Sequence, residues 1–257
     1  RTLTRFGIDQ SDGVTAVSEF LRKKTVEVFH PRRAIQVIPN FIDPSKYAPK
    51  DRGACRRDRF AKKGERILIH ISNFRPSKRV EDVVRVFAAV RREVPSVLLM
   101  VGDGADRTRS REVAVELGVE RYVRYLGQLD AVEDVLSTAD LFLLTSANES
   151  FGLAALEAMS SGVPVIGTTA EGVPELVESG ETGYLLPVGD VAGMARRAIE
   201  VLTDTDRHDA MSRRARQVAV ERYDAARIVP MYEDLYARVT DQPVAAPGYM
   251  APPEGLA

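Results

Sequence analysis

The sequence has 257 residues, of which 44% are hydrophobic and 28% charged, and its formal net charge is −1. A chain of this length buries a sizeable core, and its near-zero net charge gives no general attraction to nucleic acid or to anionic lipid. The single cysteine, Cys55, excludes an internal disulfide, and no apolar run approaches the roughly 20 residues that span a bilayer. We therefore expect a cytoplasmic globular protein with no nucleic-acid partner and no integral membrane segment.

The first 43 residues contain a strand pattern, "GVTAVS", a helix pattern, "SEFLRKKTVEVF", and a second strand pattern, "AIQVIPNFID". The chain opens on Arg1 rather than on Met. We expect residues 1–41 to be the remnant of a larger N-terminal domain whose beginning is missing. The stretch 44–60, rich in proline and charge and containing Cys55, is the expected linker.

Short apolar runs bounded by Gly, Pro or Asp follow at residues 66–72, 96–102, 122–127, 140–146, 163–169 and 183–188. Amphipathic segments lie between them, such as 79–94, where valines and Phe87 recur at helical spacing. This alternation predicts an α/β fold over residues 42–224: a Rossmann-like parallel sheet with helices on both faces. Ligands of such sheets bind beyond the carboxyl ends of the strands, so the residues that follow each strand are the candidates.

Basic and glycine-rich turns follow the first two strands of this sheet. "NFRPSKR" places Arg75, Lys78 and Arg79 at the entry to a helix, where cations and free N–H groups suit an anion. The alternative is a solvated basic turn. "GDGAD" supplies Gly102 and Gly104, which allow close approach of a ligand to the backbone or form a tight turn.

The stretch "TSANESFGLAALEAM" follows the fourth strand. Ser150 is the expected N-cap of a helix, with Gly152 in its first turn. The N–H groups of Phe151, Gly152 and Leu153 would then point toward a ligand beyond the sheet.

Glu149 and Glu157 belong to the same stretch and are separated by seven residues. At helical spacing they would lie on related sides, and a carboxylate can accept hydrogen bonds from vicinal sugar hydroxyls. The alternative is that Glu149 favours the helix dipole and Glu157 is solvated. Against that alternative, Glu157 has apolar neighbours in sequence, so its carboxylate needs a polar partner.

The remaining polar candidates have structural interpretations. His70 lies inside a predicted strand and is expected to be a core residue. Asp204-Thr205-Asp206 falls between helix patterns and is expected to cap a helix rather than to bind a metal. The pattern of residues 225–240 predicts a helix that is kinked at Pro230 and crosses back toward the N-terminal domain. Its exposed apolar side chains, at Met231, Leu235 and Tyr236, would favour a homo-oligomer, and the tail 241–257 is expected to be disordered.

Several of these motifs together resemble the retaining nucleotide-sugar glycosyltransferases of the GT-B fold. The resemblance runs from about Val14 to about Val239 and rests on "SANESFGLAALEAMSSGVPVIGT", "VGDG", "YLGQ" and "GVPELVESGETGYL". It implies that residues 42–224 bind the nucleotide-sugar donor, that the donor and acceptor sites face each other between two domains, and that no metal or other cofactor is needed.

The resemblance also assigns roles to individual residues. Glu157 would hold the ribose hydroxyls of UDP, Glu149 the hydroxyls of the donor sugar, and Lys78 the diphosphate, which makes Glu149 and Lys78 the catalytic pair. The backbone at Phe151, Gly152 and Leu153 would meet sugar and phosphate, beside Gly102 and Ser150. Asn73 stands where many members carry Arg, so either Asn73 or Arg75 contacts the diphosphate. Glu171 stands where many members carry a second glycine.

A closer resemblance, to one group within this family, predicts the substrates. "RFGIDQSDGVTAVSEFLRK", "VIPNFID" and "HISNFRPSKRVEDVVRVF" are similar to members that act in bacillithiol biosynthesis. These are expected to transfer N-acetylglucosamine from UDP-N-acetylglucosamine to L-malate. The alternatives are a GT-B transferase with another acceptor, such as a lipid, and a non-catalytic UDP-sugar-binding module. Because the acceptor pocket is expected upstream, this chain by itself is expected to be inactive in transfer.

Overall fold

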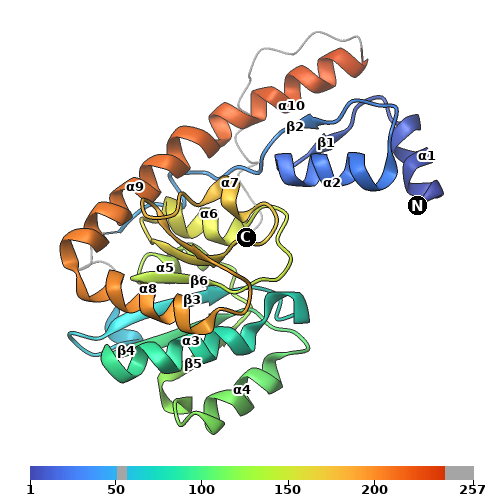
Figure 1. The fold of residues 1–257 in the computed structure, drawn as a ribbon. Coiled ribbons are helices and arrows are strands. Elements are labelled where there is room, and N and C mark those ends of the chain that lie inside the picture. Colours follow the sequence, from blue (N-terminus) through green and yellow to red (C-terminus); the bar gives the residue numbers. More distant parts are fainter. Residues whose placement is uncertain (51–56, 241–257) are drawn as a thin grey trace, which may run out of the picture.

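The computed structural model describes residues 1–50 and 57–240 (Figure 1). The linker residues 51–56, with Cys55, and the tail 241–257 lie outside the described residues, so the expectation of a disordered tail is not addressed. A six-stranded parallel sheet, in the order β5-β4-β3-β6-β7-β8, forms the centre of the larger part. The strands lie within the predicted runs: β3 Arg66–Ile71, β4 Ser96–Val101, β5 Val123–Gly127, β6 Leu141–Leu144, β7 Val165–Thr168 and β8 Gly183–Leu186.

Helices cover both faces of this sheet, as the sequence predicts. Successive residues of a strand point to opposite faces, so Leu68 of β3 belongs to one core and its neighbours Ile67 and Ile69 to the other. The first core holds α3 Val80–Glu93, α4 Arg107–Glu116 and α8 Val191–Thr203. The second holds α5 Val132–Leu136, α6 Leu153–Ser160, α7 Val173–Leu176 and most buried residues of α9 Thr205–Tyr223. Short 3-10 turns lie at η1 Arg57–Arg59, η2 Pro76–Lys78 and η3 Glu120–Tyr122.

The first 41 residues form a small separate unit. It consists of α1 Thr2–Gln10, which the sequence analysis did not predict, β1 Thr15–Ala16, α2 Glu19–Phe29 and β2 Gln36–Val37. The two strands pair in parallel with each other and do not join the large sheet.

The last helix, α10 Ala225–Thr240, extends along this small unit (Figure 1). Pro230 lies inside it. Arg238 donates a hydrogen bond of 2.7 Å to the side-chain oxygen of Gln36. Leu235 packs on Gly13: a Cβ added to Gly13 would lie only 3.2 Å from the Leu235 side chain. The expected exposure of Met231 and Leu235 is wrong, because both are half-buried and Leu235 packs on the small unit. Tyr236 is exposed, as expected.

The chain passes between the small unit and the large sheet at two places, and these lie side by side. Residues Ile42 and Asp224 form an isolated parallel bridge. The N–H of Ile42 donates to the carbonyl of Tyr223, and the N–H of Ala225 donates to the carbonyl of Ile42, both at 2.9 Å. The outgoing and returning segments are thus hydrogen-bonded to each other.

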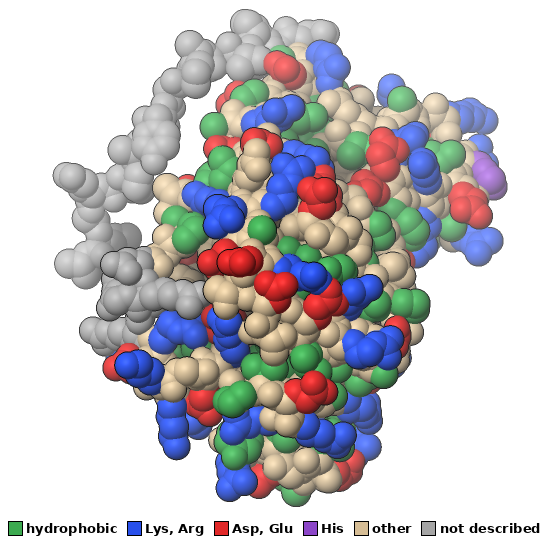
Figure 2. Space-filling model, turned by 60° about the vertical axis from the view of Figure 1, so that its left-hand side comes forward, with side chains coloured by type: hydrophobic (Ala, Val, Ile, Leu, Met, Phe, Trp, Pro, Cys, Tyr) green, Lys and Arg blue, Asp and Glu red, His purple; other side chains and the backbone are tan. Residues whose placement is uncertain are grey.

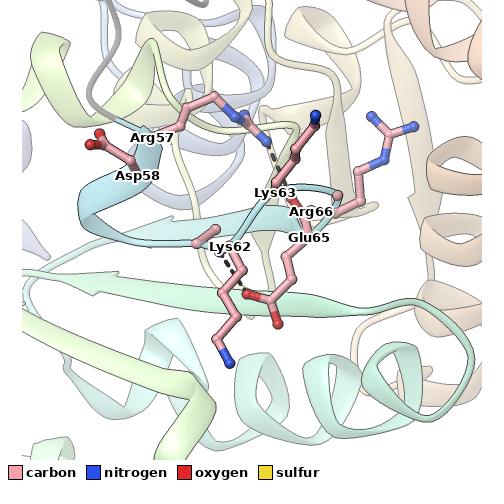
Figure 3. Close-up of a pocket in the computed structure, with 8 residues that line it drawn as sticks. Arg57, Asp58, Lys62, Lys63, Glu65 and Arg66 are labelled. Carbon is pink, nitrogen blue, oxygen red and sulfur yellow. Dashed lines mark hydrogen bonds between the residues drawn. The ribbon is translucent and has the colours of Figure 1, made fainter.

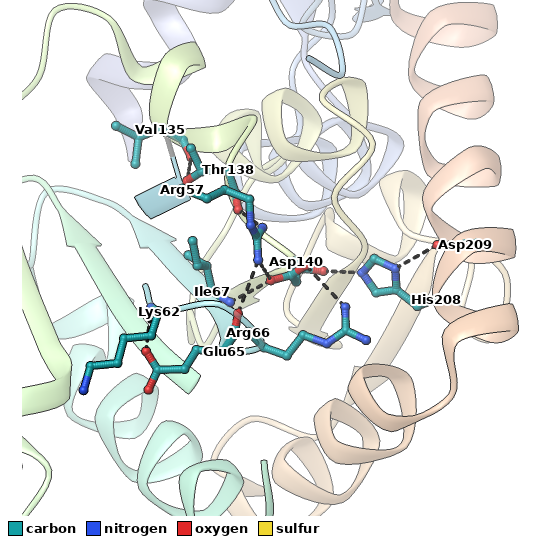
Figure 4. A network of polar contacts seen from close by, with 10 residues as sticks. All are labelled: Arg57, Lys62, Glu65, Arg66, Ile67, Val135, Thr138, Asp140, His208 and Asp209. Atoms are coloured by element: carbon teal, nitrogen blue, oxygen red, sulfur yellow. Dashed lines mark hydrogen bonds and ion pairs between the residues drawn. The ribbon is translucent and has the colours of Figure 1, made fainter. Parts of the chain in front are cut away.

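A buried carboxylate, Asp140, organises the amino edge of the sheet (Figure 4). Its oxygens accept hydrogen bonds from the N–H of Ile67 at 2.7 Å and from Arg57 at 2.8 Å, and Arg66 lies 3.5 Å away. His208 donates through Nε2 to the Asp140 carbonyl at 2.8 Å. These contacts join β3, the start of β6, η1 and α9, so His208 has a structural role.

One helix cap and the surface charges of the described residues agree with what the sequence predicts. Asp204 caps α9 by accepting a 3.0 Å hydrogen bond from the N–H of Arg207, which confirms its predicted role. Within residues 1–50 and 57–240, no helix combines the length and apolar character needed to cross a membrane. On the face shown in Figure 2, cationic and anionic side chains are interspersed, as expected for a net charge of −1.

Candidate functional site

A hollow of about 420 Å³ lies at the carboxyl edge of the sheet, beyond β3 and β6. These neighbouring strands are the place where the strand order reverses, which is the usual ligand site of an open α/β sheet. Four of the predicted side chains with polar groups line it: Asn73, Lys78, Glu149 and Glu157. Gly152 and Leu153 contribute backbone, and the remaining lining comes from Ile71, Ser72, Leu144 and Ala154.

A larger hollow, of about 790 Å³, lies at the opposite edge, next to the first residue of β3 (Figure 3). Charged side chains line it, but several already have partners: Arg57 and Arg66 pair with Asp140, and Glu65 accepts a hydrogen bond from the backbone of Lys62. The amino ends of parallel strands are not where such sheets bind ligands. We therefore place the functional site at the smaller hollow.

The loop after β3 holds Lys78 in place. The Thr145 hydroxyl, at the end of β6, donates to the carbonyl oxygens of Lys78 and Arg79 at 2.8 and 3.1 Å, and the N–H of Ala147 donates to the carbonyl of Ser77 at 2.7 Å. Buried Phe74 anchors the same loop. The Lys78 backbone is thus fixed to β6, and its side chain extends into the hollow.

Lys78 and Glu149 form an ion pair across the hollow. The Lys78 ammonium donates to Glu149 Oε2 at 2.5 Å, and the Ser146 hydroxyl donates to the same oxygen at 3.3 Å. Their side chains are 21% and 15% exposed, so both remain open to a ligand. A diphosphate that binds Lys78 would compete directly with Glu149 for this cation.

The start of α6 differs from the predicted cap. The helix begins at Leu153 with Gly152 as its N-cap, so the prediction that Ser150 is the cap is wrong. The reason is backbone conformation: Gly152 has φ of +100°, which favours glycine and keeps the preceding residues out of the helix. The N–H groups of Gly152, Leu153 and Ala154 have no acceptor among the described residues, and these residues line the hollow. They are available to an anion, as predicted for Gly152 and Leu153.

Glu157 lies on α6 and has the polar partner that its apolar neighbours in sequence demand. Burial raises the pKa of its carboxyl, and a hydrogen bond with Tyr47 and the charge of Lys46 oppose that rise. Glu133 on α5 adds to the rise. Tyr47 comes from the linker, far away in sequence, and no sequence signal pointed to it.

The linker holds Tyr47 firmly enough for this role. Arg216 of α9 donates to the carbonyl of Tyr47, at 2.5 Å, and to the carbonyl of Pro44, at 2.9 Å. The Ser160 hydroxyl also donates to the Tyr47 carbonyl, at 2.6 Å. We infer that Tyr47 orients Glu157 from behind the hollow.

Other predicted site residues lie outside the lining. Arg75 is exposed and does not line the hollow, so of the two alternatives the structure brings Asn73 to it. Gly102 is needed for packing, because a Cβ there would lie 1.8 Å from the carbonyl oxygen of Ser72. Phe151 is buried edge-to-face against Tyr223, and Ser150 precedes the hollow without lining it.

His70 is a core residue, as predicted. It is fully buried in β3, and its Nδ1 donates to the Leu143 carbonyl at 2.9 Å while Nε2 lies 2.8 Å from the Ser72 hydroxyl. Burial lowers the pKa of the imidazole to about 4. A neutral imidazole with both nitrogens engaged has no spare capacity for catalysis.

Comparison with known proteins agrees with this geometry. The family described as glycosyl transferases group 1 matches residues 51–218. The N-acetyl-alpha-D-glucosaminyl L-malate synthase of Bacillus anthracis is 46% identical over 234 residues, which are 91% of this chain and 61% of the relative. A GDP-mannose-dependent alpha-(1-6)-phosphatidylinositol monomannoside mannosyltransferase of Mycolicibacterium smegmatis is 29% identical over 86% of this chain and 60% of the relative. The chain thus spans about 60% of these curated relatives.

A solved structure shares the fold. Anabaena Alr3699/HepE, in complex with UDP and glucose, superposes with a TM-score of 0.84 at 23% identity, over 92% of this chain and 66% of that chain. The doubly covered parallel sheet predicted from the sequence is therefore that of GT-B glycosyltransferase domains.

Proposed function

Because the chain belongs to the glycosyl transferases group 1 family, we propose that it provides the donor-binding part of a retaining glycosyltransferase that uses a UDP-sugar. The observation that carries the proposal is the meeting of Lys78 with the free N–H groups of Gly152, Leu153 and Ala154 at one hollow. Each of these groups attracts an anion, and a diphosphate brings more than one negative charge.

The chemistry follows from this arrangement. Breaking the bond between sugar and diphosphate leaves the diphosphate with an additional negative charge. Lys78 and the N–H groups at the start of α6, fixed in place before the reaction, stabilise that charge as it develops. Asn73 adds a neutral donor beside them, Glu157 accepts the ribose hydroxyls, and Glu149 accepts the hydroxyls of the sugar once the diphosphate has displaced it from Lys78.

The proposed substrates are UDP-N-acetylglucosamine as donor and L-malate as acceptor, in a cytoplasmic reaction of bacillithiol biosynthesis. The 46% identity to the malate synthase of Bacillus anthracis supports N-acetylglucosamine as the transferred sugar and L-malate as the acceptor. The likeness in fold to HepE, solved with UDP, supports UDP as the carrier. The second candidate is a lipid acceptor, which the similarity to the phosphatidylinositol monomannoside mannosyltransferase favours. The donor site supports either acceptor equally.

Calorimetric titration of this chain tests the donor part of the proposal. UDP and UDP-N-acetylglucosamine are expected to bind in EDTA, because Lys78 and the helix N–H groups supply the positive charge. Binding that disappears on chelation and returns with magnesium or manganese would contradict a metal-independent site. Absence of UDP binding in either condition would contradict the donor site itself.

A product assay on the whole gene product tests the acceptor. With UDP-N-acetylglucosamine, the product is expected with L-malate and not with phosphatidylinositol mannoside. Product with the lipid alone would support the second candidate. The same assay on residues 1–257 is expected to show no appreciable transfer.

A further inference from the structure

The first turn of α2 in the small unit is capped by a side chain from α7, one of the helices that cover the large sheet. The side chain of α2's own N-cap, Ser18, accepts a hydrogen bond from the N–H of Leu21 at 3.1 Å. The carboxylate of Glu175 accepts from the N–H of Glu19 at 2.8 Å and from the N–H of Phe20 at 2.7 Å. A carboxylate that accepts two backbone N–H groups at a helix start combines charge-assisted hydrogen bonds with the favourable helix dipole.

The segment that carries Glu175 is joined to the donor site. Glu175 lies on α7, just after β7, and its own carbonyl accepts a 3.1 Å hydrogen bond from the Tyr223 hydroxyl. Gly172, three residues earlier, donates through its N–H to the carbonyl of Glu149 at 3.0 Å. A Cβ at Gly172 would lie 2.1 Å from the carbonyl oxygen of Ser150, so the two loops are in direct backbone contact.

A second contact spans the same boundary. Lys24 of α2 pairs with Glu171 at 2.5 Å, and Asn148 donates to the same carboxylate at 3.3 Å. Glu171 has φ of +47°, in the left-handed region where glycine is favoured, so this segment keeps an acid at a backbone cost. Both contacts lie at the surface: Lys24 is 49% exposed, and Glu175 is exposed as well. The cap differs in that its acceptor binds two backbone N–H groups, whose positions are fixed by α2, whereas the pair with Glu171 depends on a long lysine side chain.

We propose that Glu175 is a positioning residue that fixes α2, and with it the small unit, in a set orientation beside the donor-binding loop. The cap itself stands on the hydrogen bonds alone. The consequence for transfer rests on the proposed function: the residues that hold the acceptor would be aligned to the loop of Glu149 and Ser150 through this carboxylate.

Amide hydrogen exchange measured on residues 1–257 tests the cap. In Glu175→Ala, the amides of Glu19 and Phe20 are expected to exchange roughly tenfold faster, because both lose a charged acceptor. Glu175→Gln keeps one acceptor oxygen and is expected to show a partial effect. Glu181→Gln is the matched control. It removes an acid of the neighbouring turn whose partner, Arg214, lies on α9 and not in the small unit, so both amides are expected to stay unchanged. Unchanged exchange in Glu175→Ala would overturn the proposal.

Kinetics of the whole gene product test the positioning. Glu175→Ala is expected to lower kcat about tenfold with an unchanged KM for the donor, and Glu175→Gln to recover part of that loss. Calorimetry of the same variant is expected to give the UDP affinity of the unaltered protein. Normal turnover despite faster exchange at Glu19 and Phe20 would overturn the positioning role. A protein that fails to bind UDP before any substitution would instead contradict the donor site, while the exchange result would still report on the cap.

Discussion

Both edges of the large sheet carry charged side chains that form ion pairs. At the amino edge the carboxylate of the pair is buried and hydrogen-bonded, whereas at the carboxyl edge both partners remain open to a ligand. At the amino edge, Asp140 is buried and accepts from Arg57 and from the N–H of Ile67. At the carboxyl edge, Lys78 and Glu149 are partly open and the first N–H groups of α6 have no acceptor among residues 1–50 and 57–240. The first set is saturated and stabilises the fold. The second has hydrogen-bonding capacity left over, which is what a ligand uses.

Because of this difference, substitutions at the amino edge should alter the stability of the fold, and substitutions at the carboxyl edge should alter ligand affinity. A change at the saturated edge leaves a buried charge or donor without a partner, so it lowers the free energy of unfolding. A change at the open edge leaves its former partner accessible to water, so folding is little affected and ligand affinity is altered instead.

The largest effect is expected for Asp140→Ala. Arg57 and the N–H of Ile67 would lose a buried acceptor, and the free energy of unfolding is expected to fall by about 3–5 kcal/mol. Urea denaturation measures it. Glu112→Ala, on the exposed side of α4, is the control and is expected to stay within about 0.5 kcal/mol of the unaltered protein. A loss below about 1 kcal/mol at Asp140 would show that the network is not a stability element.

His70, in β3, also has both of its hydrogen-bonding nitrogens engaged in the buried interior, so it too is expected to affect stability. Its folded pKa of about 4 is below its ordinary value of 6.5, so between these values the unfolded chain binds the additional proton. Stability is therefore complete above pH 6.5 and is expected to fall by about 3 kcal/mol as the pH drops to 4. Urea denaturation at several pH values measures it. His70→Gln should lack this component, and an identical pH profile in that variant would contradict the assignment.

At the open edge, Lys78→Ala is expected to weaken UDP binding by about 1.5–3 kcal/mol, because a charge-assisted contact to the diphosphate is lost. Calorimetry measures the affinity. The free energy of unfolding should change by less than about 1 kcal/mol, since the pair is partly solvated. Arg75→Ala provides a control: its side chain lies outside the hollow, and equal losses in both variants would restore Arg75 as a diphosphate ligand.

The smallest effect separates the two glutamates. Glu157→Ala should weaken UDP binding more than Glu149→Ala, because UDP retains the ribose but lacks the sugar, and because removing Glu149 frees Lys78 for the diphosphate. Titrations with UDP at several pH values compare them. Since burial raises the pKa of Glu157, its contribution should fade as the pH falls toward that pKa, and Glu157→Ala should lack this component. Equal losses in affinity for both variants would contradict the two roles.

The strands and the position of the site could be predicted because both follow from local sequence. Apolar runs bounded by Gly, Pro or Asp are the signature of a doubly covered sheet, and its carboxyl edge then brings Lys78, Glu149 and Glu157 together. The start of α6 could not be fixed from sequence, because Ser150 is as good a cap as Gly152 until the backbone conformation is known.

The partners that come from distant segments could not be predicted either. Tyr47 meets Glu157, and Glu175 caps α2, across long separations in sequence. The apolar residues around Glu157 in the sequence indicate that its carboxylate needs a hydrogen-bonding partner, but they do not identify that partner. The choice between Asn73 and Arg75 likewise depends on the exact turn of the loop after β3.

The adjacent crossings at Ile42 and Asp224 have a mechanical consequence. The two crossings are hydrogen-bonded to each other and so form a single pivot rather than two separate attachments. The contacts of Glu175 and Glu171 with α2 lie away from this pivot and restrict rotation about it. Rotation displaces atoms in proportion to their distance from its axis, so a small angular change at the pivot is amplified at any surface that lies far from it.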